Sequence, residues 1–297
     1  MSDKESGFNL EMPKVGIIKG VLAKDIEVVG DKVVNIRTCA RPYENMYSVT
    51  QLRAIKSVIE KYGSGKVHLS PRHNLEIPEV KQKEIENALK ELYIAGLFPG
   101  GAGTSVRNIF TCPDWCSKQV RPVQELGKMV SMLSGDNDMP NKVTISFAGC
   151  SNGCSRPQNS DIGIIAIGEI AVKDKSCPAD CVECFKSCRF DAIEKNGKGI
   201  KINDNCTYCT KCVDPCPENI LSIKKTGFRI LTGGKEGSNV RFGKEIALFI
   251  EDFEVFEIIE RILHKYKSNA TLRPGSTRKK ERLCEVIDRL GIKSFMN

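Results

Sequence analysis

The sequence has no long apolar run, few aromatic residues and no block of like charge. A membrane-spanning helix needs about 20 apolar residues, and no stretch of this chain approaches that length. Aromatic residues make up 6% of the chain and provide no obvious platform for stacking nucleic-acid bases. The N-terminus, MSDKESGFNLEMPK, has acidic residues and no apolar segment of the secretory type. These absences predict a cytoplasmic protein that binds neither a membrane nor nucleic acid.

The formal net charge of +8 keeps a nucleic-acid-binding module as a distant alternative, which would bind with a strong dependence on salt. Polyanionic cofactors and small anionic substrates explain the same charge equally well.

Cysteine is the residue type present in unusual number, with 14 among 297 residues. Seven disulfides would suit a short secreted chain, whereas clustered thiols in a reducing cytosol more often bind metal. Two close pairs, in TCPDWC and GCSNGC, precede one dense block, and Cys39 and Cys284 stand apart. We therefore expect metal centres rather than disulfides.

The dense block contains two consecutive sets of four cysteines. Residues 206–217 have the spacing C-x2-C-x2-C-x3-C-P of bacterial ferredoxins, in which the fourth cysteine ligates the other cluster. Residues 177–188 have the same spacing with one extra residue in the first gap, and the segments CRFDAIEKNGKGIKI and CPENILSIKKTGFRI repeat after the two sets. Two zinc sites are the alternative, because CxxC pairs also suit tetrahedral zinc. The spacing favours two [4Fe–4S] clusters with crossed ligands: Cys177, Cys181, Cys184 and Cys216 for one, and Cys188, Cys206, Cys209 and Cys212 for the other.

Outside this block the pattern predicts an α+β fold of short strands and amphipathic helices. A capping box, Ser48 with Gln51, opens a helix whose inward face is expected to carry Leu52, Ile55, Val58, Ile59 and Tyr62. Further helices are expected over 79–95, 244–266 and 277–290. Strands are expected over 33–39, 66–70, 74–78, 143–148 and 162–170.

The order of motifs resembles the nitrite and sulfite reductase family, whose members bind sirohaem and a [4Fe–4S] cluster. The segments that carry the resemblance are HLSPRHNLEI, SVRNIFTCP, KVTISFAGCSNGC, DIGIIAI and GFRILTGGKEG. The chain is most similar to small single-repeat members, such as the C subunit of anaerobic sulfite reductase and the dissimilatory-type subunits. The resemblance implies a sulfite-reductase-like half-repeat with three parts: an N-terminal ferredoxin-like half-domain (1–78), a reductase domain (79–170 and 225–297) and an inserted 2[4Fe–4S] ferredoxin domain (171–224).

The resemblance also implies the remaining site residues. Cys112, Cys116, Cys150 and Cys154 would hold a third [4Fe–4S] cluster, and the Cys154 sulfur would also bridge to the sirohaem iron. The residues implied to cradle the sirohaem carboxylates are Arg107, Asn108, Lys118, Arg121, Arg156, Lys235 and Arg241, although each cation could equally be a surface charge. The cations implied to bind the substrate are Arg37, Arg72 and Lys142.

Two positions depart from the family pattern. The first cysteine pair is spaced C-x3-C where the family has C-x5-C, and Thr144 stands where the family has the second lysine of K-x-K. Loss of one charge-assisted bond to the anion would cost about 1.5–3 kcal/mol.

The resulting expectation is a six-electron reduction of sulfite to sulfide. Nitrite reduction to ammonia by the same centre is an alternative, and so is a non-catalytic iron–sulfur electron carrier without sirohaem. We find no G-x-G-x-x-G nucleotide motif, so an external electron-donor protein is expected. A single half-repeat predicts a homodimer or pairing with a similar subunit.

Overall fold

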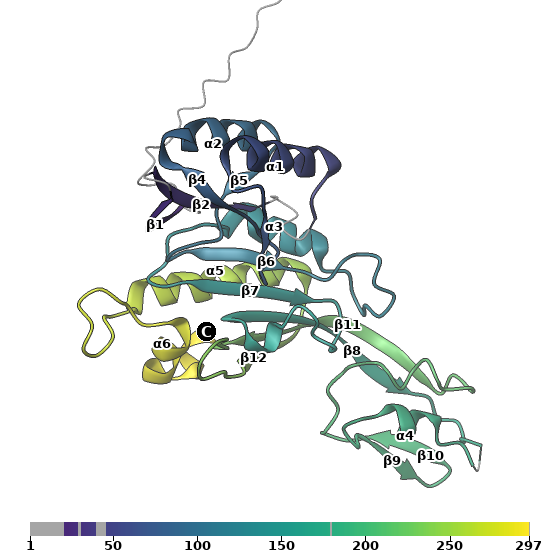
Figure 1. Ribbon diagram of the computed structural model, residues 1–297. Coiled ribbons are helices and arrows are strands. Elements are labelled where there is room, and N and C mark those ends of the chain that lie inside the picture. The colour runs from purple at the N-terminus through teal and green to yellow at the C-terminus, as the bar shows by residue number, and fades with distance from the viewer. Residues whose placement is uncertain (1–20, 29–30, 40–45, 179, 297) are drawn as a thin grey trace, which may run out of the picture. The chain divides into compact units, whose positions relative to one another are not determined.

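The computed structural model describes residues 21–28, 31–39, 46–178 and 180–296. The chain divides into two compact units, Met1–Gly103 and Thr104–Asn297 (Figure 1). Among the described residues, no helix combines the length and the apolar character that crossing a membrane requires.

The N-terminal unit is an antiparallel sheet covered on one face by two helices (Figure 1). The strand order is β1-β2-β4-β3, and β5 pairs with β2. Buried side chains from β2, β4 and both helices form one apolar core, so each helix turns its apolar stripe toward the sheet. The elements are β1 (Val21–Val28), β2 (Asp31–Cys39), α1 (Val49–Tyr62), β3 (His68–Leu69), β4 (Leu75–Lys81), α2 (Ile85–Ile94) and β5 (Phe98–Pro99).

The capping box that opens α1 is confirmed, because the Ser48 hydroxyl accepts from the Gln51 backbone and the Gln51 side chain accepts from the Ser48 backbone. Two predictions in this unit are wrong. Leu52 lies on the exposed face of α1, with 47% of its surface accessible. The helix expected over 79–95 begins only at Ile85, because β4 continues to pair with β2 as far as Lys81.

The C-terminal unit is built on a five-stranded sheet with the order β12-β11-β8-β7-β6. Strands β6, β7 and β8 run parallel to one another, and β11 and β12 are antiparallel to their neighbours. The apolar core joins strands β7, β8 and β11 to helices α3, α5 and α6. The elements outside the insert are β6 (Val106–Phe110), α3 (Gln124–Ser134), β7 (Val143–Ala148), β8 (Ile162–Val172), β11 (Leu221–Thr232), β12 (Lys244–Ile250), α5 (Asp252–Asn269) and α6 (Leu283–Leu290).

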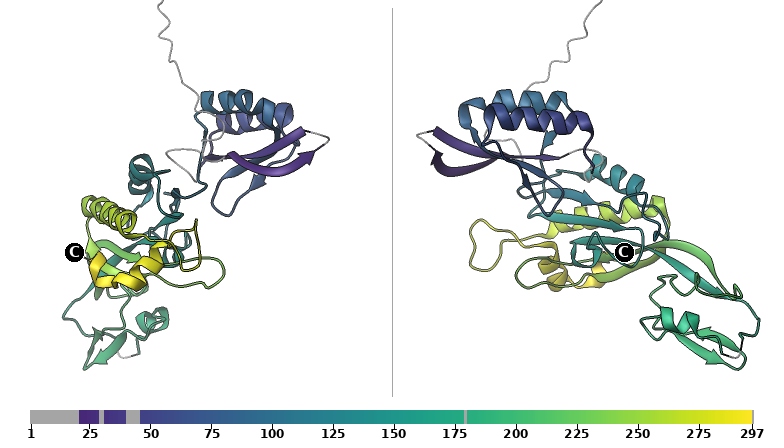
Figure 2. Two further views of the ribbon diagram at one scale, coloured as in Figure 1. Left: turned by 90° about the vertical axis from the view of Figure 1, so that its left-hand side faces the viewer. Right: turned by 45° about the vertical axis from the view of Figure 1, so that its right-hand side comes forward.

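The insert lies between β8 and β11. These two strands form a long antiparallel ribbon, and the segment that connects them folds beside its end (Figures 1 and 2). The insert contains a short helix and a two-stranded hairpin: α4 (Glu183–Ser187), β9 (Ile193–Asn196) and β10 (Gly199–Ile202). Its small core consists of apolar side chains and cysteines.

The expected strands over 143–148 and 162–170 are confirmed as β7 and β8. The helix expected over 244–266 is wrong at its start, because residues 244–250 pair with β11 and the helix begins at Asp252. The last helix begins at Leu283 rather than at 277, after Lys280 has formed a bridge with Leu272.

Candidate metal centres

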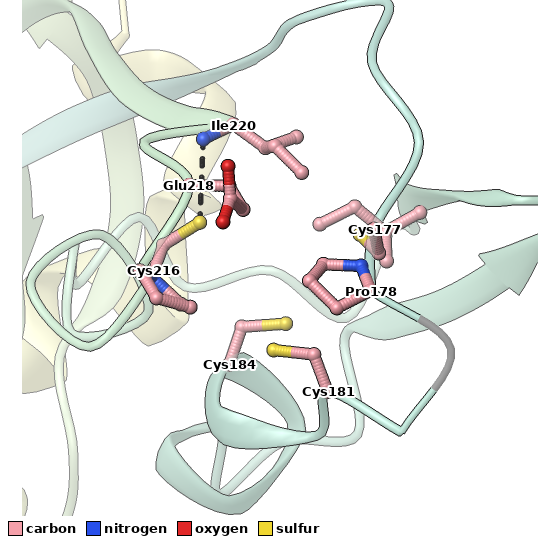
Figure 3. A pocket seen from close by; sticks show the side chains of 9 residues that line it. Cys177, Pro178, Cys181, Cys184, Cys216, Glu218 and Ile220 are labelled. Carbon is pink, nitrogen blue, oxygen red and sulfur yellow. Dashed lines mark hydrogen bonds between the residues drawn. The ribbon is translucent and has the colours of Figure 1, made fainter.

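The first crossed set of cysteines meets at one pocket of the insert (Figure 3). The four cysteines Cys177, Cys181, Cys184 and Cys216 line it, together with Pro178, Ile200, Pro217, Glu218 and Ile220. Cys184 lies on α4, whereas Cys216 comes from the second cysteine set. The fold therefore brings the fourth cysteine of one set to the first three of the other.

The second crossed set lines a second pocket. The cysteines are Cys188, Cys206, Cys209 and Cys212, and the other lining residues are Ile170, Ser187, Phe190, Ala192, Ile193, Ile202, Thr207 and Thr210. Both pockets are lined largely by apolar groups.

Equivalent backbone groups support the fourth cysteine of each set. The Ile220 N–H donates to the Cys216 Sγ at 3.3 Å, and the Ala192 N–H donates to the Cys188 Sγ at 3.4 Å. In both cases the donor lies four residues after the cysteine, so the repeat in the sequence is also a repeat in geometry. Such N–H donors stabilise negative charge on sulfur.

Burial in the two pockets favours protonated thiols. Burial raises the pKa of Cys184 and Cys206, and it raises the pKa of Cys212 to about 12. Because metal ligands must be thiolates, loading either pocket displaces protons. Among the described residues, no three His, Cys, Asp or Glu side chains converge on a point that would hold a single metal ion.

The third cysteine group lies at one edge of the five-stranded sheet. Cys112 follows β6 and Cys150 follows β7, and the carboxyl ends of these parallel neighbours meet at the same edge. Burial raises the pKa of Cys112, which also interacts electrostatically with Cys116, Cys150 and Cys154. Cys112 and Cys150 are buried, whereas Cys154 is exposed.

The insert contacts the loop that carries this third group. The Lys211 Nζ donates to the Asn152 Oδ1 at 2.8 Å, and Asn152 lies between Cys150 and Cys154. The Gly168 N–H on β8 donates to the Tyr208 carbonyl at 2.9 Å. These contacts place the 206–212 loop against the sheet, so the second pocket is the inner one of the two.

The expected cradle cations differ in how they are paired. Arg121 forms ion pairs with Glu251 and Asp252 at 3.0 and 2.8 Å and lies over the Phe228 ring. Arg241 forms a bidentate pair with Asp288 at 2.6 and 2.9 Å.

The remaining cradle residues are less constrained. Arg156 is exposed and lies 3.7 Å from Glu236. Lys118 and Lys235 form no ion pair with any residue that the structure describes. Arg107 lies half-buried on β6, and the side chain of Asn108 falls outside the described part of the chain.

The three expected substrate cations lie in both units. Arg37 and Arg72 belong to the N-terminal unit, and Lys142 precedes β7 in the C-terminal unit. Arg37 pairs with Glu76 at 2.6 Å and donates to the Gly101 carbonyl at 3.0 Å. Arg72 lies in the turn between β3 and β4, where its N–H donates to the Ser70 hydroxyl.

Glu76 is held ionised by two partners. Burial acts to raise its pKa, but hydrogen bonds from His68 and Arg37 outweigh that effect and lower it. The carboxylate therefore fixes the direction of the Arg37 guanidinium.

Thr144 belongs to a buried polar network that the sequence does not reveal. Its hydroxyl and its N–H donate to the Asp161 Oδ2 at 2.8 and 2.9 Å. Arg282 donates to both oxygens of the Asp161 carboxylate, at 2.9 and 3.0 Å, and both charged side chains are buried. The network thus links β7 to the residues that directly precede β8 and α6, and no local sequence pattern connects residues 161 and 282.

Two sequence profiles match the chain. The profile described as the nitrite and sulphite reductase 4Fe-4S domain matches residues 102–297, and the nitrite/sulfite reductase ferredoxin-like half domain matches residues 45–93.

Among similar proteins, the coenzyme F420-dependent sulfite reductase of Methanocaldococcus jannaschii is 30% identical over 88% of this chain, but the match covers only 41% of that protein. The beta subunit of the dissimilatory-type sulfite reductase of Nitratidesulfovibrio vulgaris is 26% identical, with 90% of this chain and 77% of that subunit covered.

The crystal structure of dissimilatory sulfite reductase I has the same fold, with a TM-score of 0.69 and 19% identity over 89% of this chain and 68% of that one. The mixed α+β fold expected from the sequence is therefore confirmed. Because the first profile covers more than half of the residues, the chain belongs to the nitrite and sulphite reductase family of oxidoreductases.

Proposed function

We propose that this chain is a sulfite reductase subunit that binds sirohaem and three [4Fe–4S] clusters and reduces sulfite to sulfide. The observation that carries the proposal is the convergence of two crossed cysteine quartets on two adjacent pockets of the insert. The Lys211–Asn152 contact, which joins the inner pocket to the loop of the third cysteine group, supports electron supply through the insert. The names of two relatives support sulfite as the substrate.

The same proposal divides the chain into three parts. Residues 171–224 form the ferredoxin domain. The boundary expected between residues 78 and 79 falls inside β4, so the N-terminal half-domain is the unit that ends at Gly103, and the reductase domain is the rest of the C-terminal unit. An external electron-donor protein supplies the insert. The chain forms a homodimer or pairs with a similar subunit, an arrangement supported by a relative that is itself named as a subunit.

The residues present fit the proposed cofactors. Each quartet offers four thiols facing an apolar space, with a backbone N–H already directed at the fourth sulfur. Cys154 is exposed where Cys112 and Cys150 are buried, so its sulfur has an open side that could be shared with a haem iron. Lys118, Lys235 and Arg156 offer positive charge to the acidic edge of a sirohaem. When bound, the clusters supply single electrons and the sirohaem iron supplies a coordination site for the substrate.

The cations of the chain provide the remaining chemistry. Arg37, Arg72 and Lys142 bind the sulfite oxygens and stabilise negative charge as oxygen leaves as water. The ion pair with Glu76 orients the Arg37 guanidinium, so this side chain needs less rearrangement when it binds an anion. Lys142 carries transferable protons, whereas arginine stays charged at all working pH values.

Anaerobic purification, sirohaem extraction and iron analysis test this proposal. Three clusters and one haem correspond to about thirteen irons per chain. We expect Cys216→Ser to lower the iron content selectively, while Cys284→Ser, a change outside all three cysteine groups, leaves it unchanged. Extracts without sirohaem from a host that makes it, or iron that does not respond to Cys216→Ser, would contradict the proposal.

A non-catalytic electron carrier is the second candidate, and one observation favours it. Arg121 and Arg241, two of the cations expected around the sirohaem, already have carboxylate partners. The carrier would contain about twelve irons and show no chlorin absorbance. If the chain is catalytic, comparing its turnover rates with sulfite and with nitrite separates sulfite reduction from nitrite reduction.

A further inference from the structure

The two cluster pockets of the insert differ at positions that the internal repeat makes equivalent. The residue after the first cysteine is Pro178 in the outer pocket and Thr207 in the inner one, and both line their pockets. Two residues after the fourth cysteine, Glu218 lines the outer pocket and Phe190 lines the inner one. The inner pocket thus has the Thr207 hydroxyl where the outer pocket has the Pro178 ring, which has no donor. It has the apolar Phe190 ring where the outer pocket has the Glu218 carboxylate.

The hydroxyl of Thr207 is an unsatisfied donor. Its oxygen is buried and has no hydrogen-bond partner among the described residues. A buried hydroxyl without a partner loses stabilisation that it would have in water. The Ser187 hydroxyl, which lines the same pocket, already donates to the Cys184 carbonyl at 2.8 Å. Thr207 therefore provides this pocket with a buried hydroxyl that still needs an acceptor.

An acceptor would be present in the loaded pocket. Cluster sulfides and cysteine thiolates accept hydrogen bonds, and the Tyr208 N–H, one residue further along, already donates to the Cys206 Sγ at 3.4 Å. Reduction adds negative charge to a cluster, so each donor to its sulfur atoms stabilises the reduced state. A carboxylate such as Glu218 has the opposite effect, weakened here because the residue is exposed.

We propose that the Thr207 hydroxyl donates a hydrogen bond to a sulfur of the cluster held by Cys188, Cys206, Cys209 and Cys212, and that this inner cluster consequently has a higher reduction potential than the outer one beside Glu218. Thr207 is a positioning residue for charge, not a ligand. The inference rests on the proposed function, because it requires both clusters to be present.

The order of potentials matches the position of the two pockets. The inner pocket includes Ile170 of β8, and Lys211, which lies between the pocket cysteines Cys209 and Cys212, contacts the loop of the third cysteine group. A higher potential there favours electrons moving from the outer pocket toward the sheet. In that exchange the outer site loses one electron, the inner site gains it, and no bond forms or breaks.

A redox titration of the anaerobically purified full chain, monitored by electron paramagnetic resonance, tests the inference. We expect Thr207→Val to lower the potential of one couple, changing its reduced-to-oxidised ratio at a fixed potential by up to about tenfold, which corresponds to about 59 mV for one electron. Thr207→Ser keeps the hydroxyl and should restore the wild-type value. Glu218→Gln should raise the potential of the other couple and leave the first unchanged.

The outcomes separate this inference from the proposed function. Iron analysis and the signals of two reduced clusters establish first that both pockets are loaded. If both are loaded and Thr207→Val leaves every potential unchanged, or shifts both couples equally, the inference is wrong and the proposed function stands. If the purified chain has no cluster in the insert, the proposed function is wrong and the inference with it.

Discussion

Replacement of Arg282 by methionine tests the buried network behind β7. The Arg282 guanidinium is the charged partner of the Asp161 carboxylate, which is completely buried. Without it, the carboxylate would keep only the two donors that Thr144 provides, its hydroxyl and its N–H. Removing one member of a buried pair typically costs about 3–5 kcal/mol, because an uncompensated charge stays in the interior.

The expected effect on thermal stability follows from the size of the unit. For a domain of about 150–250 residues, 1 kcal/mol shifts the melting temperature by roughly 2–4 °C. Arg282→Met should therefore lower the midpoint for the C-terminal unit by roughly 6–20 °C. Differential scanning calorimetry of the anaerobically purified chain, with iron content matched between samples, measures this shift.

Two further variants give the controls. Asp161→Asn combined with Arg282→Met removes both charges, so the double variant should be more stable than Arg282→Met alone. Lys186→Ala breaks an exposed pair with Glu183, 2.8 Å long, and should leave the midpoint almost unchanged. A midpoint for Arg282→Met within 2 °C of the wild type, or a double variant less stable than the single one, would refute the reasoning.

Three other predictions concern separate features. The hydrogen bond from Arg289 lowers the pKa of Glu281 to about 2, against the opposing effect of burial. The stabilising contribution of Glu281 is therefore present above the unfolded pKa of about 4.3 and is lost as the pH falls through about 2. Glu281→Gln should flatten the dependence of stability on pH over that window, in acid titrations monitored by circular dichroism. Lys211→Ala should slow reduction of the third cysteine site in stopped-flow measurements without loss of iron, whereas Lys224→Ala, which breaks an exposed pair with Glu169, should not. Gly234→Ala would place a Cβ 2.3 Å from the Ser160 backbone oxygen and should lower the free energy of unfolding by about 1–3 kcal/mol. Gly199→Ala is the control, because its Cβ would lie 3.7 Å from the nearest backbone oxygen and it therefore measures the effect of a glycine-to-alanine change without a clash.

Local signals predict the start of one helix and two of the strands that lie beside the cysteine loops. The capping box at Ser48 fixes the start of α1, and the short apolar runs at 143–148 and 162–170 become β7 and β8. The apolar pattern gives the wrong element where a segment is compatible with both the helical period of about 3.6 residues and the strand period of about 2. Residues 244–250 carry apolar side chains compatible with a helix, and only their pairing with β11 makes them a strand.

The crossed cysteine quartets were predictable because each depends on local spacing and on a repeat of the same motif. The two pockets are lined by the quartets that the spacing indicates, with the fourth cysteine exchanged between sets. The buried hydroxyl of Thr207 was not predictable, because no sequence pattern shows that its oxygen lacks a hydrogen-bond partner among the described residues.

The ion pairs of Arg121 and Arg241 could not be predicted from the sequence either. They change how the positive charge of the chain is interpreted. Arg121 and Glu251 are 130 residues apart, and Arg241 and Asp288 are 47 apart, so no sequence window contains both partners. A basic residue near a cofactor motif therefore says little about whether its charge is available. An acidic cofactor edge competes with these carboxylates for Arg121 and Arg241, but it meets no such competition at Lys118 or Lys235. If a sirohaem binds here, the unpaired lysines provide attraction without first breaking an ion pair, and the paired arginines contribute only where the cofactor displaces a carboxylate.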